Sequence, residues 1–315
     1  MTDPGPTPGR LRQLRWLAEW VLAWPWLALA RALPGPAARA YARVLGHVVV
    51  TLLVSERRRC LAHLRRGLGD GRSEAELAAL ARAVFVHHAL TFVEILRMTP
   101  AEVARVTVAG LEHLPAIRAA SAGRGIIAVS GHLGNFELFA PAIERFGQPA
   151  TLLVRPLDNP WFEAMLARCR RRYGARTLPR THEGLREALR RLDRNEAVLF
   201  AIDQNAAQGG VAIRAFGHPA RAAPGAVELA LWRGCAVVVG AIHRCDAGGH
   251  HLEFGPPVEL VRTGRRAADV ATNLQRLVDG VERHILAHPA QYHWQHDRWR
   301  TPVHPSGASS AGSAR

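Results

Sequence analysis

The sequence predicts an α/β fold with a mainly parallel central sheet flanked by helices, preceded by a membrane-associated helix near the N-terminus. Two observations lead to this fold class. From residue 107 onward, short apolar runs of strand length alternate with longer segments of helical periodicity. Near the start of the chain, a tryptophan-rich apolar segment follows a group of arginines, a combination typical of a membrane surface.

The alternating part of the chain predicts which polar residues gather at one edge of the sheet. Apolar runs predict strands at 125–130, 150–154, 197–202, 235–242 and 251–255, and the segments between them predict helices near 135–146, 160–173, 181–195, 225–233 and 267–288. Active residues of parallel sheets gather beyond the carboxyl ends of the strands. We therefore expect His132, Arg155 and Asp203, each of which follows a strand, to converge.

The tryptophan-rich segment predicts a membrane anchor. Four of the eight tryptophans lie between residues 16 and 26, and tryptophan favours the membrane interface. The uninterrupted apolar part, Trp20 to Ala30, would be only about 16 Å long as a helix, against a hydrocarbon core of about 30 Å. Glu19 and Pro25 also disfavour a clean span. We expect a retained helix, tilted or lying partly in the interface, with the preceding arginines on the cytoplasmic side. The alternative is an aromatic-rich helix packed on the body of the protein.

The remaining organisation follows from composition and periodicity. The expected segments are a disordered start and anchor helix (1–35), one domain (36–301) with a helical part (36–106) and an α/β part (107–301), and a disordered tail (302–315). A second apolar helix is expected over residues 37–54. Residues 73–98 show two helical patterns that begin at the cap-like Ser73.

The stretch from Ser130 to Glu137 carries the clearest chemistry. His132 lies where a strand ends and a helix begins, and Glu137 follows five residues later. Five residues of α-helix turn the chain by about 140°, so the two side chains meet only if His132 lies on the turn before the helix. His132 would then be a general base oriented by Glu137, and the positive end of the helix would keep the resting imidazole neutral. The alternative is a histidine that caps a helix beside a surface glutamate.

This hexad, His-Leu-Gly-Asn-Phe-Glu, resembles the His-x4-Asp/Glu signature of the glycerolipid and lipid A acyltransferase superfamily, and is similar to that of the lipid A late acyltransferases (lauroyl/myristoyl type). Further segments resemble that family in the same order along the chain. They are Arg155 to Pro160, Arg170 with Arg172 and Gly174, Asp203-Gln204-Asn205, Val211 to Gly217 with Pro224-Gly225, and Pro289 to Trp299. Two positions depart from the family pattern: Ala215 replaces a phenylalanine, and His63 stands where asparagine is usual.

The resemblance implies an enzyme that moves a fatty acyl chain from an acyl carrier protein, or from acyl-CoA, to a hydroxyl of a lipid A precursor or related anionic glycolipid. It further implies a cell inner membrane location with the catalytic domain facing the cytoplasm, no cofactor and no metal. The implied site residues fall into three groups: His132 and Glu137 as the catalytic pair; Arg155, Asn159, Arg170, Arg172, Asp203 and Gln204 for oxyanion or substrate binding; and Trp294, His296 and Arg298 at the acceptor site or as its support.

Composition agrees with an anionic partner. The 315-residue chain has a net charge of +15, and all of its basic residues other than histidine are arginine, which also suggests a GC-rich genome. Nucleic acid is disfavoured because no aromatic–basic motif accompanies the charge. The four cysteines show no paired spacing and are expected to be reduced thiols. Two alternatives remain open: another acceptor, such as a phosphatidylinositol mannoside or a lysophospholipid, and a non-catalytic basic membrane-binding protein.

Overall fold

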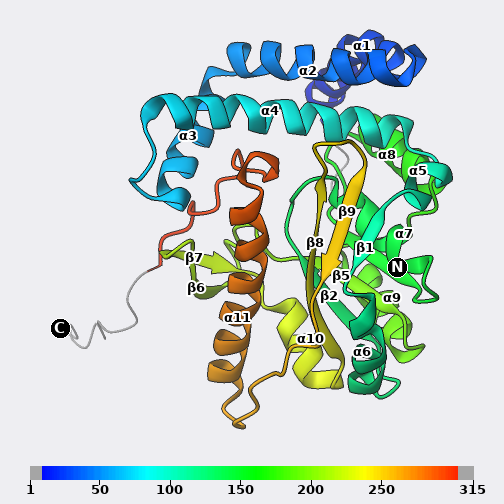
Figure 1. Cartoon of the computed structure of the whole chain (residues 1–315), viewed down its shortest axis with the longest axis vertical. Coiled ribbons are helices and arrows are strands. Elements are labelled where there is room, and N and C mark those ends of the chain that lie inside the picture. Colours follow the sequence, from blue (N-terminus) through cyan, green and yellow to red (C-terminus); the bar gives the residue numbers. More distant parts are fainter. Residues whose placement is uncertain (1–8, 304–315) are drawn as a thin grey trace.

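The computed structural model describes residues 9–303 and has a seven-stranded sheet at its centre (Figure 1). The strand order is β1-β9-β8-β2-β5-β3-β4, and every neighbouring pair is parallel except β8 with β9. The strands are β1 Thr107–Ala109, β2 Ile126–Ser130, β3 Ala150–Val154, β4 Thr177–Pro179, β5 Ala197–Ala201, β8 Ala236–Arg244 and β9 His250–Phe254. A separate antiparallel hairpin consists of β6 Val211–Ala215 and β7 His218–Ala222. The predicted fold class, α/β with a mainly parallel central sheet, is thus confirmed.

Helices cover both faces of the sheet and also form a layer across one end of it. They are α1 Arg10–Ala32, α2 Gly35–Leu52, α3 Val54–Leu68, α4 Glu74–Arg97, α5 Pro100–Ala104, α6 Leu114–Ser121, α7 Phe139–Glu144, α8 Pro160–Arg172, α9 His182–Asp193, α10 Gly225–Arg233 and α11 Arg266–Ala287. Short 3₁₀ turns occur at η1 Leu111–His113, η2 Phe136–Leu138 and η3 Pro289–Gln291. The expected disordered ends lie largely outside the described residues.

The core is divided into two clusters by the sheet. The central strand β2 is buried throughout, and its side chains alternate between the two sides, as strand geometry requires. Ile127 and Val129 belong to the cluster that includes residues of α11, whereas Ile126 and Ala128 belong to the cluster that includes Phe139 of α7. Burial on both faces explains why the strands of this sheet read as continuous apolar runs.

Helix α4 crosses the molecule above the sheet and contributes to both core clusters (Figure 1). Its N-terminus is fixed by a capping box in which Ser73 and Glu76 bond each other's backbone N–H groups, as the sequence predicted. The prediction of two helical patterns over residues 73–98 is wrong, because α4 is one continuous helix. By length and hydropathy, α4 meets the requirements for a membrane span, as do α2 and α3 together, although these two are bent by 93°. Its core contacts mark α4 as an internal helix.

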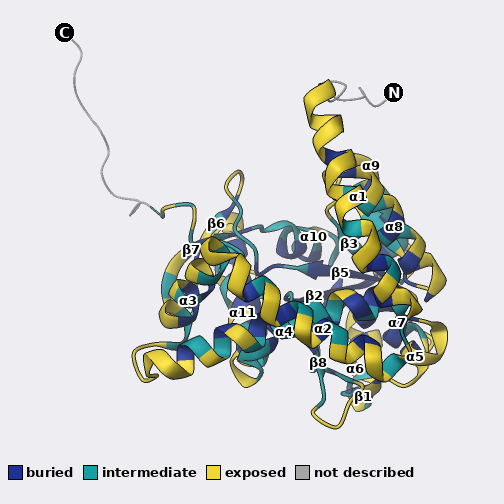
Figure 2. Ribbon diagram, turned by 90° about the horizontal axis from the view of Figure 1, so that it is seen from above, coloured by how far each residue is buried: buried dark blue, intermediate teal, exposed yellow. Residues whose placement is uncertain are grey.

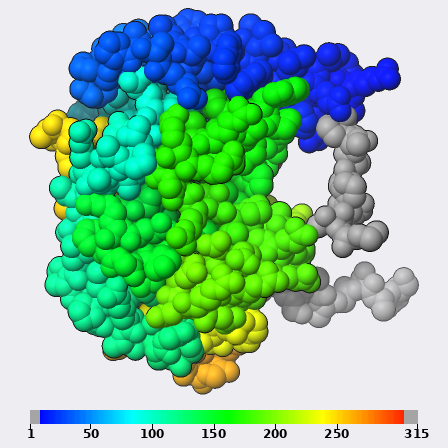
Figure 3. All heavy atoms as spheres, turned by 90° about the vertical axis from the view of Figure 1, so that its right-hand side faces the viewer, coloured from blue at the N-terminus to red at the C-terminus, as the bar shows by residue number. Residues whose placement is uncertain are grey.

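Helices α1 and α2 lie on the outer side of α4 and cover one end of the molecule, seen in blue in Figure 3. Much of their apolar surface is exposed, and Figure 2 shows α1 with long exposed segments. The exposed large apolar residues here are Leu11, Leu14, Leu17, Val21, Leu22, Trp24, Trp26, Leu29, Val44, Val48 and Leu52. The predicted apolar helices near the N-terminus are therefore present. They expose a larger apolar surface than a soluble monomer usually does.

The expected α/β elements are largely confirmed, with three differences. The strands β1 and β4 have only three residues each and were not predicted. The β6–β7 hairpin was also missed, because its exposed positions include arginine, proline and histidine in place of a clear apolar alternation. The helix expected at 135–146 is divided into the 3₁₀ turn η2 and the short helix α7, a difference that matters for Glu137.

Candidate active site

Register between two neighbouring strands brings His132 and Asp203 together. In the parallel pair β2 and β5, Ser130 lies opposite Ala201. The backbone N–H of Ile202 then donates to the carbonyl of Ser130 (3.1 Å), which extends the pairing by one residue. His132 and Asp203 each lie two residues beyond the last paired position of their strand, so the sheet carries both side chains to the same edge. The predicted convergence is therefore confirmed for these two residues.

Asp203 binds His132 through both its side chain and its backbone. The Nδ1 atom of His132 lies 2.8 Å from Oδ1 of Asp203, and the backbone N–H of His132 donates to Oδ2 (2.8 Å). A carboxylate at Nδ1 favours the tautomer that carries its proton there, which leaves the Nε2 lone pair as the acceptor. The side-chain nitrogen of Gln204 lies 3.3 Å from this Nε2 atom. The ring is thus oriented as a general base requires.

The charge around His132 also favours proton uptake. Burial lowers the pKa of His132, but the charge and hydrogen bond of Asp203, together with the charge of Glu137, outweigh burial and raise the pKa. Burial in turn raises the pKa of Asp203, and its contacts with His132 outweigh that effect and hold it well below its usual range. The expectation that a helix end keeps the imidazole neutral is wrong, because the two carboxylates outweigh any effect of η2 and α7, which follow the histidine.

Glu137 has different partners from those predicted. Nε of Arg170 donates to Glu137 Oε2 (2.9 Å), and the hydroxyl of Tyr173 donates to the same oxygen (3.1 Å). The side chains of Glu137 and Arg170 are only 2% and 7% exposed. The prediction that Glu137 holds the His132 ring is therefore wrong: η2 directs the glutamate toward α8, while both ring nitrogens of His132 have other partners.

Three further predicted residues support the fold. The buried Asn159 caps α8 by accepting from the N–H of Trp161, and its amide donates to the carbonyl of Trp16 (3.0 Å) in α1. Arg172 donates to the carbonyls of Leu96 and Met98 at the end of α4. Arg170 is occupied by Glu137, as described above. In the structure Asn159, Arg170 and Arg172 thus have partners within the protein, and their expected contact with substrate stays a prediction.

Arg155 lies at the surface beyond the end of β3. Its side chain is 70% exposed, and its partner Asp158, at 3.5 Å, is 77% exposed. Within residues 9–303, no hydrogen bond or ion pair links Arg155 to His132 or Asp203. The predicted convergence of Arg155 with those two residues is not seen, because β3 is separated from β2 by β5.

The segment that contains His293, His296 and Arg298 bonds the turns that carry His132 and Asp203. The N–H of His293 donates to the carbonyl of His132 (3.2 Å), and the buried Arg298 donates to the carbonyl of Gln204 (2.6 Å). His296 accepts from the N–H of Asn205 (2.9 Å). Trp294 is 1% exposed and belongs to the core. Trp294, His296 and Arg298 thus make supporting contacts in the structure, and their expected place at the acceptor site stays a prediction.

Sequence reasoning missed two histidines beside the site. The rings of His88, from α4, and His293 lie 4.5 Å apart, and the His293 ring lies 6.3 Å from that of His132. Burial lowers the pKa of both His88 and His293, so they add polar groups to the site without adding positive charge near pH 7. His293 falls inside a segment that had been singled out, but no local pattern distinguishes His88.

A second network holds the same turn from the side of α4. The amide of Asn135 donates to Glu94 (3.2 Å), and Glu94 is also bound by Arg244 (2.7 Å) and His250 (3.1 Å). Burial raises the pKa of Glu94, but hydrogen bonds from His250 and Arg244 and their charges outweigh it, giving a pKa of about 2. Asn135 is thus tied to an ionised carboxylate, which explains why an asparagine suits this position of the motif.

Comparison with known proteins assigns this arrangement to a family. The sequence model of the bacterial lipid A biosynthesis acyltransferases matches residues 7–301. The chain belongs to this family. The members to which it is similar include the lipid A biosynthesis palmitoleoyltransferase of Escherichia coli (strain K12), at 30% identity over 206 residues. That alignment covers 64% of this chain and 63% of the relative.

Relatives with other names are nearly as similar to the chain. The lipid A biosynthesis lauroyltransferase of Escherichia coli (strain K12) is 29% identical over 213 residues, covering 64% of each chain. The phosphatidylinositol mannoside acyltransferase of Mycobacterium tuberculosis (strain ATCC 25618 / H37Rv) is 28% identical over 200 residues, covering 61% of this chain and 59% of the relative. Each alignment thus spans less than two thirds of the relative's own length.

The contacts of Glu137 predict a large effect on stability. In Glu137→Gln, Arg170 becomes a buried guanidinium without a compensating charge, and the free energy of unfolding should fall by about 3–5 kcal/mol. The control Glu56→Gln breaks an ion pair with Arg59 whose side chains are 33% and 42% exposed, and should have a far smaller effect. Urea unfolding of both variants measures the difference. Equal stability of the two variants would contradict the structural role of Glu137.

Proposed function

We propose that this protein is a membrane-associated O-acyltransferase. It transfers a fatty acyl chain from an acyl carrier protein thioester to a hydroxyl of a lipid A precursor or related anionic glycolipid. The observation that carries the proposal is the pair of His132 and Asp203, which leaves Nε2 of the histidine as a proton acceptor at the carboxyl edge of the sheet. The family membership and the names of the relatives support the reaction class.

In this mechanism the acceptor hydroxyl attacks the thioester directly. Nε2 of His132 removes the hydroxyl proton as the oxygen forms its bond to the thioester carbonyl carbon. Asp203 stabilises the imidazolium that results, since its carboxylate already bonds Nδ1. When the carbonyl re-forms, the carbon–sulfur bond breaks, and the leaving thiolate takes the proton from the imidazolium. The ester and the free carrier thiol are the products, and no acyl-enzyme is formed.

Arg155 is proposed to contact a phosphate of the acceptor. Its exposed ion pair with Asp158 is worth little in water, so the guanidinium is free to turn toward an anionic ligand. A planar guanidinium binds phosphate through two parallel hydrogen bonds. Of the two roles expected from the sequence, phosphate binding fits this exposed position better than stabilisation of the oxyanion, which needs a fixed donor.

One prediction from this mechanism concerns the proposed base. Removing the imidazole in His132→Ala should lower the rate of acyl transfer by about 10²–10⁴, because proton abstraction then falls to water. The matched control is His182→Ala, which removes an exposed histidine from the start of α9 and should retain full activity. Turnover of an acyl carrier protein thioester with a lipid A precursor measures both variants. Near-normal turnover by a folded His132→Ala variant would exclude His132 as the base, whereas no turnover by the unaltered protein would favour a non-catalytic membrane-binding protein.

A further prediction concerns how the rate of acyl transfer depends on pH. Activity requires neutral His132, and its pKa is raised, so the rate should increase with pH through a value above the ordinary 6.5. Asp203→Asn removes the negative charge that raises this pKa, so the acidic limb should move to lower pH. The plateau rate should also fall by about 10²–10⁴, because the imidazolium loses its counter-charge. Profiles of the rate against pH for both proteins test this; a lower plateau with an unmoved limb would show that Asp203 is merely structural.

We further propose that the catalytic domain faces the cytoplasm at the inner membrane, held by the exposed apolar side of α1 and α2. Helices that lie in the interface combine apolar and aromatic residues with arginines on their polar side. The chain has this combination, since Trp24 and Trp26 are 53% and 58% exposed and Arg10, Arg12 and Arg15 precede them. Desolvation of these side chains by lipid would stabilise attachment.

A matched pair of tryptophans tests this surface. Trp26→Glu should weaken binding to vesicles of anionic phospholipid several-fold, because a carboxylate replaces an apolar group at the membrane. Trp232→Glu changes an equally exposed tryptophan, 59% against 58%, on α10 at the opposite end of the molecule (Figure 1), and should leave binding unchanged. Co-sedimentation with vesicles measures both. An equal loss in the two variants, or no loss in Trp26→Glu, would place the membrane contact elsewhere.

A further inference from the structure

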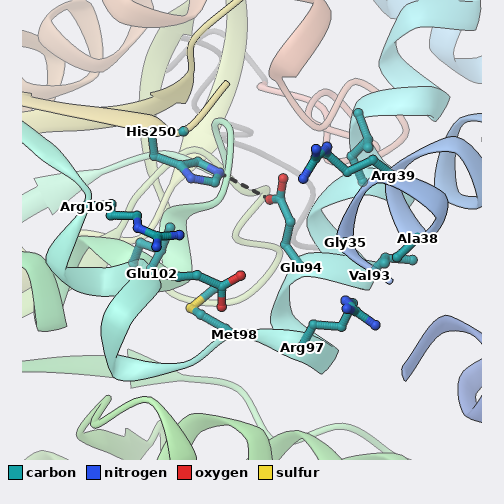
Figure 4. Close-up of a pocket in the computed structure, with 13 residues that line it drawn as sticks. Gly35, Ala38, Arg39, Val93, Glu94, Arg97, Met98, Glu102, Arg105 and His250 are labelled. Carbon is teal, nitrogen blue, oxygen red and sulfur yellow. Dashed lines mark hydrogen bonds and ion pairs between the residues drawn. The ribbon is translucent and has the colours of Figure 1, made fainter. Parts of the chain in front are cut away.

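A cavity of about 250 Å³ opens beside α4 (Figure 4). It lies between the first turn of α2, the C-terminal half of α4, the end of α5 and the turn that leads into β9. Its lining does not include His132, Asp203 or Gln204. The cavity thus lacks the three residues proposed for proton transfer, although Leu138 of η2 and Glu94, which accepts from Asn135, border the same turn. It is adjacent to the helices whose apolar surface is exposed.

One part of the lining is apolar and fixed. Leu90, Val93, Met98 and Leu138 are each buried and belong to one core cluster. Two acidic residues also line the pocket. Glu94 is engaged by Arg244 (2.7 Å) and by His250 (3.1 Å), as the dashed line in Figure 4 shows for the histidine. Glu102 accepts from the backbone N–H of Thr99 (2.8 Å). An alkyl segment can lie against this wall without meeting an unpaired charge.

The other part of the lining is basic. Arg39 comes from α2, Arg97 from α4 and Arg105 from the residue after α5. Arg97 is occupied by the carbonyls of Ala30 and Arg31. Figure 4 shows the guanidinium groups of Arg39 and Arg105 directed into the pocket from opposite sides, and within residues 9–303 neither group has a hydrogen bond or ion pair.

The N-terminus of helix α2 also favours an anion in this pocket. Its first turn, which begins at Gly35 on the pocket wall, contains no acidic residue, and its N-terminus has no side-chain cap. In that turn Pro36 has no N–H and the N–H of Ala38 donates to the carbonyl of Pro34, so the backbone N–H groups of Gly35 and Ala37 remain available to an anion. Two unpaired guanidinium groups and an uncapped helix start, beside an apolar wall, together define the chemistry of a ligand.

We propose that this cavity binds an anionic amphiphile, with a phosphate between Arg39 and Arg105 and an alkyl segment along the apolar wall. A lipid phosphate fits better than a free anion, because the apolar wall would otherwise remain exposed to water, and because α1 and α2 place the opening beside the surface proposed to meet the membrane. The volume suits a headgroup with a short length of chain and not a whole lipid. The inference concerns binding only and does not rest on the transfer reaction.

Calorimetric titration of the full chain tests the site with three probes: dodecyl phosphate below its micelle concentration, dodecyl maltoside, and inorganic phosphate. Dodecyl phosphate should bind with one-to-one stoichiometry and more tightly than either of the others. The double variant Arg39→Ala/Arg105→Ala should bind it at least about tenfold more weakly, since it loses two charge-assisted contacts. The matched control Arg82→Ala/Arg283→Ala removes the same charge from exposed positions outside the pocket and should bind like the unaltered protein.

Three other outcomes would each overturn the proposal. Equal affinity of the double variant and its control would remove the arginines from the site. Dodecyl maltoside binding as tightly as dodecyl phosphate would show a purely apolar site, and inorganic phosphate binding as tightly would show a free-anion site. Thermal unfolding of both double variants checks their folding, and Arg39→Gln/Arg105→Gln, which keeps polar side chains of similar length, serves if the alanine variant is unstable. Because the titration involves no turnover, its failure is distinct from a failure of acyl transfer.

Discussion

The pair formed by His132 and Asp203 depends on the parallel register of β2 and β5, and much of the site depends on that pair. A buried carboxylate is costly unless charge and hydrogen bonds compensate it. Asp203, whose side chain is 6% exposed, is compensated by the ring of His132, by the backbone N–H of the same residue and by the charge of Arg298. One contact thus fixes the orientation of the imidazole, its tautomer and the path of the turn that carries it.

The chain supports this pair with segments that are remote in sequence. Residues near the C-terminal end of the described chain bond both turns, through His293 to the carbonyl of His132 and through Arg298 to that of Gln204. On the other side, Glu94 of α4 accepts from Asn135. Because the C-terminal segment and α4 both bond the turn that carries His132, the geometry of the site depends on contacts between segments that are remote in sequence. A loop held in this way can keep a base in position without a ligand, as preorganised catalysis requires.

The sequence allowed the location of the site to be predicted, but not all of its partners. The apolar runs that end before His132 and Asp203 predicted two strands and a shared edge, and both were found. Spacing pointed to Glu137, five residues from His132, whereas the partner at Nδ1 is 71 residues away. Local patterns report neighbours along a helix or strand, and contacts across strands depend on register, which no local pattern specifies. The contact of Asn159 with α1, 143 residues away, was missed for the same reason.

Asp203 and Glu137, the acid of the motif, therefore act on the histidine in different ways. Asp203 supplies the hydrogen bond and the nearest charge, and so has the larger effect on the proton affinity of the ring. Glu137 acts at longer range through its charge and also holds η2 against α8 through Arg170 and Tyr173. That turn carries Phe136, whose ring lies 4.8 Å from the ring of His132 at a steep angle. Two carboxylates thus confine one imidazole, the first by binding it and the second by fixing the aromatic wall beside it. Nε2, beside the amide of Gln204, is left as the nitrogen that can accept a proton.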